Sequence, residues 1–144
     1  MEKSSKVMIG YGAFLVAGAL VAISISGWDR SKTALFSSGS AAVLMIAFAW
    51  LASMSAKPAR AIGAHLGMLF PLIFAATFGW RLSLNRAKPS AEEWLAQNPG
   101  KELQTRLVES ALQNWLFPVF IVGSLVAFVL ILRLRPKPAT PAAA

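Results

Sequence analysis

The sequence predicts an all-α membrane protein in which four transmembrane helices form two antiparallel hairpins, with an amphipathic helix before the last span. Two observations indicate this fold class: four long apolar runs separated by charged residues, and a composition that is 56 % hydrophobic and 14 % charged. The mean hydropathy of +0.59 lies above the range usual for soluble proteins. With 144 residues, the chain has room for a single membrane domain, 1–144, and no second core.

The first span covers about residues 7–27. Its apolar run exceeds the roughly 7–15 residues of a signal-peptide core, so we expect this span to be retained. The charged stretch 28–32 is predicted to be a tight turn. The second span, about 33–54, begins with small residues and ends with bulky ones. This pattern is typical of a helix that approaches a neighbour closely at one end; the alternative is a crevice polar enough for a lipid headgroup.

A second short turn, residues 55–60, leads into the third span at about 61–80. The third span has twenty residues without a charged side chain, which make about 30 Å of helix, the thickness of a bilayer's hydrocarbon core. Gly63 and Gly67 share one helix face, because four residues advance a helix by about 40° beyond a full turn. Pro71 removes the backbone hydrogen bond to Gly67 and is expected to kink the helix.

Residues 81–114 form the one long polar segment. Ser90 and Glu93 have the spacing of a capping box, which predicts a short helix that the Asn-Pro-Gly run at 98–100 ends. From Lys101 onward, apolar residues follow helical spacing opposite a charged face, which is typical of an amphipathic helix. This helix either lies in the membrane interface or continues directly into the last span.

The last span covers about residues 115–132, enough to cross a bilayer with little tilt. Pro118, near its start, either begins a new helix or places a hinge there. The Pro/Ala-rich tail 136–144 is expected to be disordered. Four spans place both termini on one side of the membrane. Lys and Arg residues divide equally between the two sides, and the basic cluster after the last span favours cytoplasmic termini.

The sequence offers little for catalysis, and we expect no enzyme and no catalytic residues. Every Asp and Glu lies outside the four spans, which argues against an ion-coupled transporter. One histidine without any cysteine cannot form a zinc site, and no nucleophilic triad or phosphate-binding loop is present. We therefore expect no metal and no cofactor. The net charge of +8 arises from clusters where apolar runs end, so we expect membrane lipids and not nucleic acid as partners.

The candidate site for guest binding or helix packing consists of Gly63, His65, Gly67 and Pro71. An ionisable group inside a span is a functional candidate. His65 is interpreted as a structural imidazole bonded to a backbone carbonyl or a serine, as a polar contact for a guest, or as a haem ligand that needs a second ligand such as Met68. The glycine pair either packs on another span of the same chain or joins a second copy or another membrane subunit.

Three stretches of the chain resemble the TMEM14 family of small multi-span membrane proteins, over roughly the first 90 residues. The first is Tyr11-Gly12 followed by Gly18. The second is Gly27-Trp28, which leads through Arg30 and Lys32 to Leu35, Ser38 and Gly39. The third is the exit of the third span, FGWRLSLNRAKPSA. The chain departs from the family pattern where the polar segment replaces a Phe-Met-Pro-Ala-Gly-like turn. The resemblance implies a protein that carries or accommodates a lipophilic guest, fatty-acid-like or porphyrin-like.

Two functions of different classes are therefore expected. The first is a small carrier or accommodating protein for a lipophilic guest, as the resemblance implies and as the absence of charge inside the spans allows. The alternative is a non-catalytic accessory or assembly subunit of a larger membrane protein complex, which the small size and the glycine face favour. The expected location is the bacterial cytoplasmic membrane, with an organelle membrane as the alternative.

Overall fold

The computed structural model describes residues 3–89, 91–100 and 103–134, and this part of the chain contains helices and no strand. Its helices are α1 (Lys3–Ser26), α2 (Trp28–Ala52), α3 (Lys57–Arg86), α4 (Ala91–Gln97) and α5 (Leu103–Leu134). Within the described residues, four of them, α1, α2, α3 and α5, contain stretches long and apolar enough to cross a membrane. The predicted all-α membrane fold class is confirmed.

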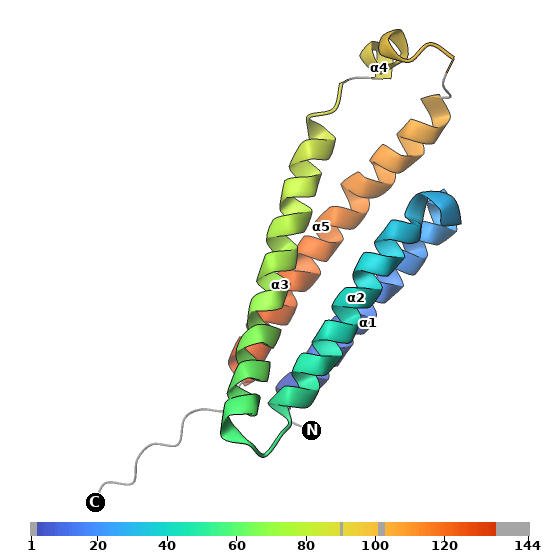
Figure 1. The fold of residues 1–144 in the computed structure, drawn as a ribbon. Coiled ribbons are helices and arrows are strands. Elements are labelled where there is room, and N and C mark those ends of the chain that lie inside the picture. The colour runs from blue at the N-terminus through green and yellow to red at the C-terminus, as the bar shows by residue number, and fades with distance from the viewer. Residues whose placement is uncertain (1–2, 90, 101–102, 135–144) are drawn as a thin grey trace, which may run out of the picture.

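The four long helices form a bundle of two antiparallel hairpins, α1–α2 and α3–α5 (Figure 1). The hairpins meet through α1 on α5 and α2 on α3, so the order around the bundle is α1, α2, α3, α5. The start of α1 and the end of α5 lie at the same end of the bundle, which we call the terminal end. We call the opposite end, which carries α4, the head end.

The reversal between α1 and α2 is tighter than the predicted turn at 28–32. Helix α2 already begins at Trp28, and Gly27 alone separates it from α1. Gly27 has a φ of 83°, in the left-handed region that side chains disfavour, and its N–H donates to the carbonyl of Ile23 at 2.8 Å. A single glycine therefore ends α1 and lets the chain reverse, and the prediction of a five-residue turn is wrong.

The turn between α2 and α3 is also shorter than the predicted 55–60. Helix α3 begins at Lys57, so only residues 53–56 connect the two helices. Pro58 lies in the first turn of α3, where its fixed φ suits a helix and its missing N–H costs no hydrogen bond. Pro58 belongs to the predicted turn at 55–60, but in the structure it lies at the start of helix α3.

The predicted polar segment 81–114 is divided among three helices. Helix α3 continues through Arg86, α4 is the predicted short helix, and α5 begins at Leu103. Gly100 follows α4 with a φ of 87°. Ser90, Lys101 and the tail 136–144, on which three predictions depend, lie outside the described residues.

The predicted amphipathic segment and the last span form one continuous helix, α5. Of the two alternatives, the amphipathic segment therefore continues directly into the span and is not a separate interfacial helix. Pro118 lies inside this one helix and therefore does not begin a new one. Pro71 likewise lies inside α3, which is helical on both sides of it. Both prolines are thus accommodated within long helices.

Helices α3 and α5 are longer than a membrane span requires. Their 30 and 32 residues make about 45 and 48 Å of helix, against about 30 Å of hydrocarbon core. At the head end, both helices extend beyond the α1–α2 hairpin and carry α4 (Figure 1). We call residues 81–114 the head. Exposed Trp28, Trp80 and Trp115 lie near its base, at the level where aromatic residues favour the membrane interface.

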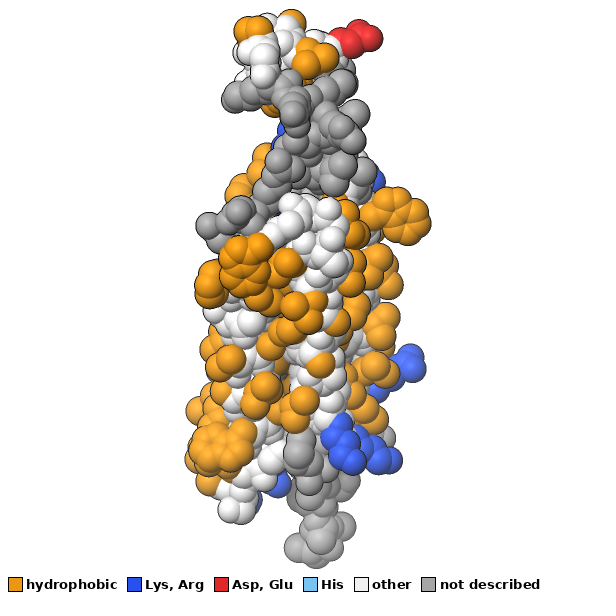
Figure 2. Space-filling model, turned by 90° about the vertical axis from the view of Figure 1, so that its right-hand side faces the viewer, with side chains coloured by type: hydrophobic (Ala, Val, Ile, Leu, Met, Phe, Trp, Pro, Cys, Tyr) orange, Lys and Arg blue, Asp and Glu red, His pale blue; other side chains and the backbone are white. Residues whose placement is uncertain are grey.

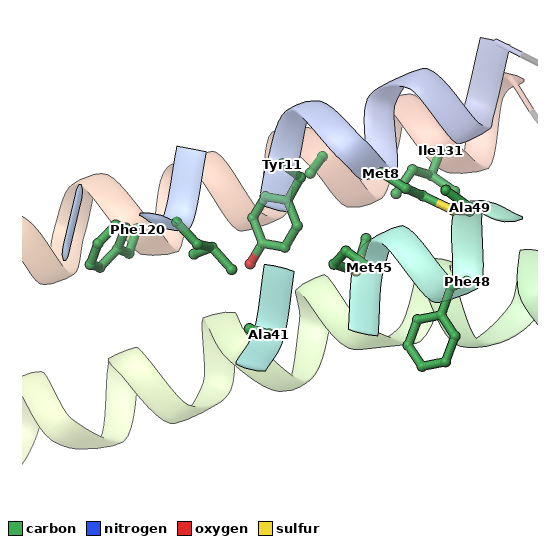
Figure 3. Close-up of a cluster of buried hydrophobic side chains, with 10 residues drawn as sticks. Met8, Tyr11, Ala41, Met45, Phe48, Ala49, Phe120 and Ile131 are labelled. Carbon is green, nitrogen blue, oxygen red and sulfur yellow. The ribbon is translucent and has the colours of Figure 1, made fainter. Parts of the chain in front are cut away.

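The core of the bundle is filled by side chains from all four long helices. Met8, Leu15 and Met45 are fully buried, and Ile131 closes the core from α5. Figure 3 shows Met8, Met45 and Ile131 gathered between the helices, while Phe48 points toward α3. These residues hold the two hairpins together over the terminal half of the bundle.

Candidate functional site

Gly63 lies where α3 crosses α2 most closely. It is buried, and a Cβ atom at this position would collide with the backbone N of Ala52, while Leu51 Cβ and the Phe48 carbonyl oxygen would each lie 2.7 Å away. Two of these three neighbours are backbone atoms, which cannot move aside without displacing the helix. Gly63 therefore allows the backbones of α3 and α2 to touch.

Gly67 faces a different helix. A Cβ atom there would meet the side chain of Met8, which reaches from α1 across the bundle. Pro71 is also fully buried, one turn further along α3. The Gly63/Gly67 face is therefore covered by α1 and α2 of the same chain.

His65 lies on the outer surface of α3, apart from the two glycines and Pro71. Its side chain is exposed, and its Nδ1 lies 2.7 Å from the carbonyl oxygen of Ala61. A carbonyl only accepts hydrogen bonds, so Nδ1 must carry the proton. In the neutral ring, Nε2 is then a hydrogen-bond acceptor on the exposed side. The structure thus places three candidate residues inside the bundle and one outside it.

A row of phenylalanines follows the inner face of α3 and was not singled out by sequence analysis. Phe70, Phe74 and Phe78 are spaced four residues apart, with ring centroids 5.5 and 5.9 Å from their neighbours in the row. At the terminal end of the row, Phe70 contacts Phe48 of α2, at 5.2 Å. At the other end, Phe78 stacks on Phe120 of α5, at 4.8 Å. In the sequence, three phenylalanines follow Gly67 at intervals of four residues, and this spacing predicts that their rings lie on one face of the helix.

Two aromatic–glycine contacts join α1 and α5 in reciprocal fashion. A Cβ at Gly18 of α1 would collide with the ring of Phe120 of α5, and a Cβ at Gly123 of α5 would meet the ring of Phe14 of α1. The two rings are packed edge to face, with centroids 5.7 Å apart. Each glycine therefore makes room for the phenylalanine of the other helix, and the interior at this level is occupied.

A hydrogen-bonded neck joins α3 and α5 at the base of the head. Asn85 Nδ2 donates to Asn114 Oδ1 at 3.1 Å, and Lys88 Nζ donates to Gln113 Oε1 at 3.4 Å. Asn85 is buried, although it lies beyond the apolar part of α3. The first contact joins α3 to α5 where they leave the bundle, and the second joins Lys88, two residues after the end of α3, to α5.

The described residues show no group of three or more His, Asp or Glu side chains arranged to hold a metal ion. Among the candidate residues, the two glycines and Pro71 pack between helices, and His65 offers a hydrogen-bonding nitrogen at the surface. No family model, no curated protein and no solved structure matches this chain.

Proposed function

We propose that the protein is a non-catalytic accessory or assembly subunit of a larger membrane protein complex, and that it docks through its head. The observation that supports this proposal most directly is the projection of α3 and α5 beyond the α1–α2 hairpin (Figure 1). Helices α3 and α5 have 30 and 32 residues, against 24 and 25 in α1 and α2. A bundle that only had to fill its own interior would not need this roughly 10 Å of extra helix on one side.

The filled interior supports the same proposal. The positions at which sequence analysis expects a guest, Gly63 and Gly67, contact α2 and α1, and Gly18 and Gly123 contact phenylalanine rings. A guest inside the bundle would have to displace these groups, and each displaced side chain would lose its packing contacts.

The head has the surface that a docking element requires. On α4, Glu92 and Glu93 are exposed, and so is Leu95, an apolar side chain on a seven-residue helix. The Asn85–Asn114 hydrogen bond fixes the base from which this surface projects. A rigid base reduces the conformational entropy that is lost on docking.

Replacement of residues 87–102 by a Gly/Ser linker of the same length tests the proposal. Purification in mild detergent is expected to recover stoichiometric protein partners with the parent chain and none with the linker variant. The melting temperature in detergent serves as the control, because the core contacts of Met8 and Met45 lie far from the head and should keep the bundle folded. Equal recovery of partners by the two proteins would contradict docking through the head.

A lipophilic guest is the second candidate, and the resemblance to the TMEM14 family implies it. The observation that favours it is the outward position of His65, whose exposed Nε2 can accept a hydrogen bond from a guest on the lipid-facing side of α3. The same purification distinguishes the two candidates. A stoichiometric bound lipid with no protein partner would favour the carrier over the subunit.

A further inference from the structure

A second surface, at the terminal end, carries a concentration of positive charge that helix packing does not use. Lys3 and Lys6 lie at the start of α1, Lys57 and Arg60 at the start of α3, and Arg133 near the end of α5. All are exposed except Arg60, which is half-buried. The antiparallel arrangement brings these three helix ends together, although their residues are far apart in the sequence. We call these five side chains the basic end.

Charge is distributed unequally between the two ends of the bundle. Within the described residues, every Asp or Glu belongs to the head end: Asp29 at the start of α2, Glu92 and Glu93 on α4, and Glu109 in the first third of α5. Figure 2 shows Lys and Arg side chains toward the terminal end, smaller areas of them below the head, and a carboxylate only at the top of the head on this face. None of the basic-end side chains has a hydrogen-bonding or ionic partner among the described residues.

We propose that the basic end is a binding surface for the headgroups of anionic phospholipids, and that it faces the cytoplasmic leaflet. The charges lie immediately beyond the apolar surface of the bundle, at the depth of lipid phosphates. Trp50, 63 % exposed and two residues before the end of α2, marks the interface at this level. The surface therefore complements anionic headgroups both in charge and in its position along the membrane normal.

The test compares two triple variants of the purified full-length protein. The first, Lys57→Gln/Arg60→Gln/Arg133→Gln, removes three charges from the basic end. The second, Arg30→Gln/Arg81→Gln/Arg86→Gln, removes three from the head end, spares the neck residue Lys88, and serves as a matched control. Each protein is equilibrated in mixed micelles with phosphatidylglycerol and phosphatidylcholine, and the lipids that it retains are counted by native mass spectrometry at 50 mM and 500 mM salt. Circular dichroism confirms that both variants are folded.

The parent chain is expected to retain phosphatidylglycerol preferentially at low salt and to lose that preference at high salt. Each basic side chain near an anionic surface contributes about 1 kcal/mol, or about fivefold, so the basic-end variant should lose up to about 100-fold of the preference. The head-end variant should keep it. An unchanged preference in the basic-end variant, or an equal loss in the head-end variant, would overturn the proposal. Loss of a bound acidic protein without a change in lipid preference would also overturn it.

Discussion

The hydroxyl group of Tyr11 on α1 lies 2.7 Å from Oγ of Ser124 on α5, in a fully buried pair that joins residues 113 positions apart. Ser124 donates its own proton to the carbonyl of Phe120, at 2.6 Å. A serine hydroxyl has only one proton, so Tyr11 must be the donor of the bond between the two side chains. This bond fixes the register of the first hairpin against the second, between neighbours that are mostly apolar.

Tyr11→Phe and Ser124→Ala each remove one partner of this bond and should couple in a double-mutant cycle. Interhelical hydrogen bonds in membrane proteins average about 0.6 kcal/mol, with a maximum near 1.7 kcal/mol, so we expect a coupling energy in this range. Unfolding in mixed micelles with increasing sodium dodecyl sulfate measures it. If the losses of the two single variants simply add in the double variant, the hydrogen bond does not contribute to stability.

Three Gly→Ala substitutions in α3 should differ in their cost. Gly63→Ala should lower the free energy of unfolding by about 1–3 kcal/mol, because the new methyl group meets the backbone of α2. Gly67→Ala should cost less, since the methyl group meets the flexible end of Met8. Gly79→Ala is the control: nothing lies within 4 Å, and alanine favours a helix by up to about 1 kcal/mol. The same unfolding assay measures all three, and a larger cost at Gly67 than at Gly63 would contradict these contacts.

The topology can be tested by cysteine labelling, because the chain has no cysteine of its own. Asn98→Cys at the head and Ser55→Cys in the loop between α2 and α3 should react with a membrane-impermeant maleimide from opposite sides. The orientation of the basic end further predicts that Ser55→Cys is labelled only when the cytoplasmic side is accessible. Labelling of both positions from one side would rule out the four-span arrangement.

His65→Ala should leave the protein folded. The side chain is exposed and its hydrogen bond to Ala61 lies within one helix, so no contact between helices is lost. We expect a change of about 0.6 kcal/mol or less in the free energy of unfolding. If a lipid is bound through Nε2, its retention in mild detergent should fall while the melting temperature stays constant. Unfolding of this variant would instead assign His65 a structural role.

Several features were predictable from the sequence because they depend on local properties. The number of spans follows from the length of each apolar run compared with the bilayer, and the short helix at Ala91–Gln97 follows from its flanking Ser90 and Asn98-Pro99-Gly100 signals. Turn boundaries were less predictable. Charged residues after Gly27 and around Pro58 suggested loops, but both stretches continue as helix, because a glycine with positive φ and a proline in the first turn make short reversals possible.

The partner of each helix face was decided only by the tertiary structure. In a soluble protein the buried face is the apolar one, but in a membrane the lipid-facing side is equally apolar, so hydrophobic periodicity does not mark the interior. For this reason the sequence alone shows that Gly63 and Gly67 share a face but not that α2 covers one and Met8 the other. It likewise leaves open whether His65 faces a neighbour or lipid. Packing places it outside, since the phenylalanine row and the glycines already occupy the inner face of α3.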